Sequence, residues 1–90
     1  MNPSYRFVVT GRVQAVGFRT NVQGKALSLG LRGWVRNRPD GAVEGLANGE
    51  ETALSQFHEW LPRGSPSARV LSVVWETSMD SPPEGFEIHR

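Results

Sequence analysis

Cysteine is absent from this 90-residue chain, and only two histidines, His58 and His89, are present. Without cysteine the protein has no disulfide, no thiolate nucleophile and no cysteine-based zinc site. Neither histidine has a partner at the spacing of metal ligands, so we expect no metal and no cofactor. The lack of cysteine is typical of proteins from reducing compartments, and we expect a cytoplasmic location.

Long apolar runs are also absent. No stretch approaches the roughly 18 residues needed to span a bilayer. Residues 1–6 contain no basic segment followed by an apolar core, so we expect no targeting segment and no membrane association. A chain of this length buries one modest core. We therefore expect a single domain over residues 1–90, monomeric by default, with no separate cofactor domain.

Acidic residues are missing from the first 39 positions, which hold seven Lys/Arg, whereas residues 40–90 hold three Lys/Arg and nine Asp/Glu. The two parts thus carry +7 and −6. A basic segment can bind RNA, but the aromatic-rich segment that RNA-recognition sheets use is absent. We expect the strands of both parts to interleave and their charges to meet, which leaves a local positive site near Arg19. We expect no nucleic-acid partner.

Apolar periodicity in the first third of the chain predicts a strand followed by a helix. Apolar and polar residues alternate over residues 6–13, and Gly11 interrupts this strand, which indicates a bulge. Helical spacing then continues from an N-cap at Thr20 or Asn21 to a stop at Gly30.

The remainder of the chain predicts a hairpin, a second helix and two more strands. The hairpin joins residues 31–37 to 42–46 around a Pro-Asp-Gly turn. The helix begins near Glu50 and ends before Pro62, and the strands cover residues 69–76 and 86–89. This order predicts an α+β fold, the ferredoxin-like (split βαβ) sandwich, with two helices on one face of a four- to five-stranded antiparallel sheet.

The loop from Gln14 to Arg19 joins the first strand to the N-terminus of the first helix. Unpaired backbone N–H groups and the helix dipole favour an anion at such a position. Arg19 adds a planar, permanently charged fork that can hold two phosphate oxygens. The loop therefore predicts a phosphate site that needs no metal.

Two runs, Gly11–Arg19 (GRVQAVGFR) and Gly33–Glu44 (GWVRNRPDGAVE), together resemble the signature of the acylphosphatase family. The resemblance extends over nearly the whole chain, and long motifs have few chance matches. It implies an enzyme that hydrolyses the carboxyl–phosphate bond of a small-molecule acyl phosphate, without a metal, to a carboxylate and inorganic phosphate. The acyl group itself is left unspecified.

The resemblance also implies the roles of particular residues. It assigns phosphate binding to Arg19 and orientation of the attacking water to Asn37. Backbone amides of the loop formed by Gln14, Ala15, Val16, Gly17, Phe18 and Arg19 would complete the phosphate cradle. Phe18 and Trp34 are expected to be core or support residues.

The chain departs from the family pattern at Ala15, where the family has glycine. If this position needs a positive φ, a Cβ there costs on the order of 1 kcal/mol, unless Gly17 absorbs the change. Ala15 would favour an alternative function, a catalytically weak anion- or phosphometabolite-binding module of the same fold. Two further functions, RNA binding and service as a domain of a larger carbamoyl-transfer enzyme, are less favoured.

Overall fold

A computed structural model describes residues 2–90, which form five strands, two α-helices and one short 3-10 helix. In chain order these are β1 (Ser4–Arg12), α1 (Phe18–Ser28), β2 (Arg32–Asn37), β3 (Val43–Asn48), α2 (Glu51–Trp60), η1 (Leu61–Arg63), β4 (Arg69–Ser78) and β5 (Phe86–Ile88). No helix within the described residues is long and apolar enough to cross a membrane.

The five strands form one sheet in the order β4-β1-β3-β2-β5. The first four pair antiparallel in the split βαβ arrangement, which confirms the predicted fold class. The direction of the last strand corrects the prediction of a purely antiparallel sheet, because β5 pairs parallel with β2. After β4 the chain crosses to the far edge of the sheet, where β5 runs in the same direction as β2.

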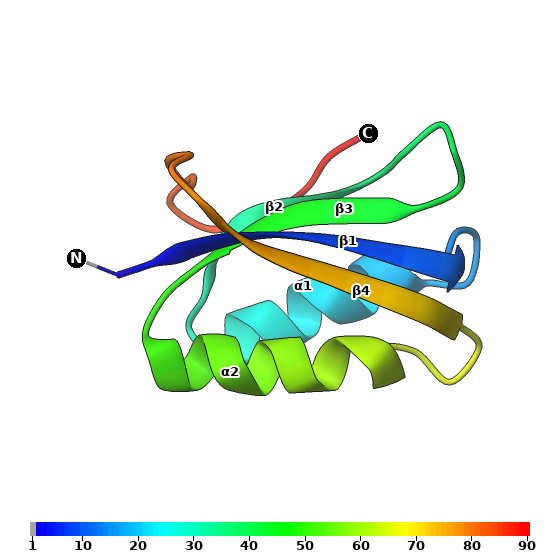
Figure 1. The fold of residues 1–90 in the computed structure, drawn as a ribbon, viewed down its shortest axis with the longest axis horizontal. Coiled ribbons are helices and arrows are strands. Elements are labelled where there is room, and N and C mark those ends of the chain that lie inside the picture. The colour runs from blue at the N-terminus through cyan, green and yellow to red at the C-terminus, as the bar shows by residue number, and fades with distance from the viewer. Residues whose placement is uncertain (1) are drawn as a thin grey trace.

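Both helices cover one face of the sheet and leave the other face open (Figure 1). The apolar side chains of the covered face meet those of α1 and α2 in a single core. The largest fully buried side chains in this core are Phe7, Phe18, Phe57, Leu54 and Leu61. Glycine at position 45 allows this packing, because a Cβ there would lie 2.3 Å from the ring of Phe7.

Local signals located most element ends to within two residues. The register between β1 and β4 shifts at Thr10 and Gly11, which confirms the bulge. Gly11 has φ 126°, and a Cβ there would lie 2.0 Å from a backbone carbonyl oxygen. Gly30, with φ 73°, follows the end of α1 as predicted.

The predicted N-cap of α1 is wrong. The helix begins at Phe18, and its N-cap is Gly17, with φ 74° and no side-chain cap. Thr20 and Asn21 lie inside the first turn and are exposed. The reason is that Phe18 is buried, so packing of its ring draws the start of the helix toward the core.

The open face of the sheet joins the basic and acidic parts of the chain, as expected. Glu44 of β3 lies between Arg6 of β1 and Arg36 of β2 and forms ion pairs with both. Trp34 also lies on this face, where its ring stacks on the ring of His89. The guanidinium carbon of Arg36 lies 5.2 Å from the centroid of the Trp34 ring, in a cation–π contact. Of the two predicted places for Trp34, core or support, the core is therefore excluded, whereas Phe18 is buried in the core.

Candidate active site

The loop between β1 and α1 presents the start of a helix to a small pocket. Ala15 and Gly17 both adopt positive φ, 61° and 74°, and turn the chain sharply into α1. The first turn of α1 contains no acidic residue that would compete for its free N–H groups. This end of the helix therefore favours an anion.

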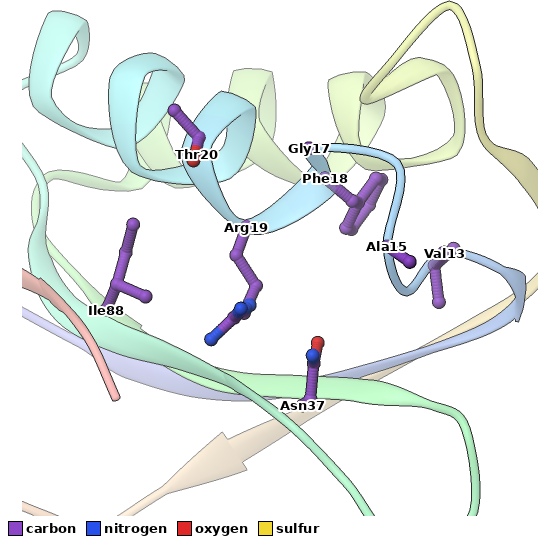
Figure 2. A pocket seen from close by; sticks show the side chains of 8 residues that line it. All are labelled: Val13, Ala15, Gly17, Phe18, Arg19, Thr20, Asn37 and Ile88. Atoms are coloured by element: carbon purple, nitrogen blue, oxygen red, sulfur yellow. The ribbon is translucent and has the colours of Figure 1, made fainter. Parts of the chain in front are cut away.

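The pocket at this helix end has a volume of about 100 Å³. This volume is well below the roughly 300–1,000 Å³ of pockets that bury drug-sized ligands, so the pocket suits a small group. Figure 2 shows Arg19 extending from α1 toward the sheet and Asn37 extending from β2 toward Arg19. The lining residues are Val13, Ala15, Gly17, Phe18, Arg19, Thr20, Asn37 and Ile88.

The guanidinium of Arg19 makes a hydrogen bond to the protein, and its positive charge is available to bind an anion. Its Nη1 donates a hydrogen bond of 3.1 Å to the carbonyl oxygen of His89. Among residues 2–90 it forms no ion pair with a carboxylate. A guanidinium without a carboxylate partner, at a helix N-terminus, is suited to bind phosphate oxygens.

Asn37 is the last residue of β2 and points to the same side of the sheet as the buried Val35. Its Oδ1 is buried and accepts no hydrogen bond from any group of the described residues. A buried amide oxygen without a donor is rare, because such a group loses its hydration on burial. Since Asn37 lines the pocket and its amide extends toward Arg19 (Figure 2), this oxygen is suited to accept a hydrogen bond from a bound water molecule.

The side chains of the predicted loop divide into two groups. Ala15, Gly17, Phe18 and Arg19 line the pocket, and Gln14 and Val16 do not. The Nε2 of Gln14 instead donates to the carbonyl oxygens of Arg38 and Ala42, at 2.7 and 2.9 Å. The carbonyl oxygen of Val16 accepts a hydrogen bond of 3.2 Å from the buried Ser65.

Gln14 thus ties the loop to the hairpin turn that follows Asn37. The Gln14 side chain thus connects the loop that carries Arg19 with the end of the strand that carries Asn37. The strain expected at Ala15 is present, and Gly17 does not absorb it, because both residues have positive φ.

Three lining residues had no assigned role in the site prediction. Val13 precedes the loop and already belongs to the run Gly11–Arg19, and Thr20 directly follows that run. Ile88 comes from β5, far away in the chain, and no local signal identifies it. Among residues 2–90 no three His, Cys, Asp or Glu side chains are grouped as metal ligands. His58 stacks on Trp75, away from the pocket.

The family model for acylphosphatases matches residues 5–88 of the chain. The chain belongs to the acylphosphatase family. An acylphosphatase of Alkalilimnicola ehrlichii is 46% identical over 88 residues, which are 98% of this chain and 99% of the relative. The crystal structure of acylphosphatase from Bacillus subtilis is 44% identical, with a TM-score of 0.90, covering 98% of this chain and 99% of that one.

The structure of an acylphosphatase from Coxiella burnetii is also similar, with 38% identity and a TM-score of 0.93 over 98% of this chain and 93% of that one. Membership in the family confirms the predicted enzyme, an acylphosphatase that hydrolyses acyl phosphates. This membership favours the enzyme over the binding module that Ala15 suggested.

Proposed function

We propose that Arg19 and Asn37 are the catalytic residues of this acylphosphatase and that residues 14–19 form its phosphate cradle. The observation that carries the proposal is the unpartnered, buried Oδ1 of Asn37 facing a pocket that Arg19 enters from the opposite side. Arg19 and the N–H groups of the loop would bind the oxygens of the phosphoryl group. Asn37 would accept a hydrogen bond from the attacking water.

In this mechanism the water oxygen forms a bond to phosphorus while the bond from phosphorus to the acyl oxygen breaks. The electron pair leaves with the carboxylate, and the proton of the water passes to the phosphate product or to solvent. Because a carboxylate is already a good leaving group, the protein mainly positions the reactants and offsets charge. We therefore propose that hydrolysis proceeds without a metal.

The size of the pocket supports a small phosphoryl site with the acyl group outside it. We also propose a cytoplasmic, monomeric protein whose residues 1–90 form one domain and which binds no nucleic acid. The last point is supported by the lack of the aromatic-rich segment that RNA-recognition sheets use.

The test is hydrolysis of an aryl acyl phosphate, with a chelator present, by the natural protein, Arg19→Gln and Asn37→Ala. Loss of one preorganised donor or acceptor typically lowers the rate by about 10²–10³, and we expect both variants to fall by at least this much. Arg19→Gln should also lose inhibition by inorganic phosphate, whereas Asn37→Ala should keep it. This difference separates phosphate binding from orientation of the water.

Arg63→Gln is the matched control, because it removes the same charge from an exposed position away from the pocket. It should keep full turnover. Turnover of Asn37→Ala equal to that of the natural protein would contradict the role proposed for its amide. Inhibition of the natural protein by the chelator would contradict metal-independent hydrolysis.

A further inference from the structure

Glu44 is a buried carboxylate on the open face of the sheet, on the side opposite the pocket. Its side chain is only 7% exposed. Its Oε1 accepts a hydrogen bond of 2.7 Å from Arg6, and its Oε2 accepts one of 2.6 Å from Arg36. Arg38 Nη1 lies 3.9 Å from Oε1. A desolvated carboxylate is costly unless charged partners surround it, and here three arginines do so.

Two of these arginines, Arg36 and Arg38, flank Asn37 in the chain. Because side chains alternate along a strand, Arg36 lies on the open face while Asn37 points to the pocket. Ion pairs that hold Arg36 and Arg38 therefore also limit the directions in which the Asn37 side chain can point on the pocket side of the sheet.

The sheet itself gives Asn37 little support on its outer side. The pairing of β5 with β2 ends at Val35 and Ile88, and the last backbone contact there is the hydrogen bond of 2.8 Å from His89 N to Val35 O. On the inner side Asn37 makes the last pair of the ladder, with Val43 of β3. Beyond this pair Arg38 N donates a hydrogen bond of 2.8 Å to Ala42 O, so Asn37 is held by the backbone on its inner side and has no strand partner among the described residues on its outer side.

We propose that Glu44 is a positioning residue, which holds the end of β2 through Arg36 and Arg38 and thereby fixes the amide of Asn37 against the pocket. The inference rests on the proposed role of Asn37. Glu44 itself is not among the residues that line the pocket.

The first test is the kcat and KM of Glu44→Gln, which keeps the shape of the side chain and removes its charge. A misplacement of 1 Å can cost about 10²-fold in rate, so partial loosening of Asn37 should lower kcat about tenfold. Inhibition by inorganic phosphate should not weaken, because the substitution leaves the cradle and Arg19 unchanged. The loss of one negative charge also favours binding of an anion. A weakened phosphate inhibition would instead indicate damage to the cradle and overturn the proposal.

The second test separates positioning from a general loss of structure. If Glu44 acts through Asn37, then Glu44→Gln added to Asn37→Ala should change the residual rate by less than about twofold, since coupled residues are not additive. The same tenfold loss in both backgrounds would overturn the proposal. An inactive Asn37→Ala beside a fully active Glu44→Gln would refute only the role of Glu44, whereas a fully active Asn37→Ala would refute the proposed site.

Glu76→Gln is the matched control, because it removes one negative charge from an exposed position on the same face. Its kcat should equal that of the natural protein, and a tenfold loss there would assign the effect to net charge. Arg36→Gln provides a second variant at a half-exposed side chain, in case Glu44→Gln does not fold. It should give the same fall in kcat and the same lack of effect in the Asn37→Ala background, and a natural kcat would overturn the proposal.

Discussion

Replacing Ala15 with glycine should stabilise the protein, although it deletes a methyl group. Ala15 is exposed and has φ 61°, in the left-handed region that disfavours a Cβ. This conformation costs about 1–2 kcal/mol for a residue with a Cβ. Glycine also gives the unfolded chain more freedom, which offsets about 0.4–1 kcal/mol of that gain. The net expectation is a stabilisation of about 0.5–1 kcal/mol from these two opposing effects.

The assay is thermal unfolding followed by circular dichroism. For a chain of this length, about 1 kcal/mol corresponds to a Tm shift of roughly 4–8 °C, so we expect Ala15→Gly to raise Tm by about 2–8 °C. Turnover should be retained, because glycine keeps the same loop conformation. A lower Tm would refute the reasoning, since the methyl group would then contribute more than the backbone strain costs.

Two replacements of glycine by alanine serve as controls, one expected to lower stability and the other to raise it. Gly17 has φ 74° with open space around it, so Gly17→Ala should lower Tm by about the amount that Ala15→Gly raises it. Gly24 lies inside α1, also with open space, so Gly24→Ala should raise stability by about 1 kcal/mol through helix propensity. A rise in all three variants, or a fall in all three, would show that φ does not decide the effect.

The contacts that hold the loop and the sheet give two further predictions, both measured as shifts of the urea midpoint. Gln14→Ala removes two hydrogen bonds to backbone carbonyls and should lower the free energy of unfolding by about 1–3 kcal/mol. The control, Gln56→Ala at an exposed position, should change it little. Equal urea midpoints for the two variants would contradict this prediction. Gly45→Ala would place a Cβ 2.3 Å from the ring of Phe7 and from a backbone carbonyl oxygen, so it should cost about 3 kcal/mol. Gly85→Ala meets only open space, and a similar loss there would show that crowding is not the cause.

The sequence by itself was sufficient for the order of the elements and for the motif that carries Arg19 and Asn37. Both are local properties, because alternation and helical spacing depend on side chains a few positions apart. The same holds for the bulge at Gly11 and the end of α1 before Gly30, where a positive φ requires a particular residue type.

Contacts between distant parts of the chain were decided only by the tertiary structure. The direction of β5 depends on how the chain crosses the sheet after β4, and no periodicity encodes that path. The Gln14 side chain bonds carbonyl groups 24 and 28 positions away, so its turn away from the pocket could not be predicted locally. Likewise, Glu44 meets Arg6 across 38 positions of sequence, because β1 and β3 become neighbours only once the sheet has formed.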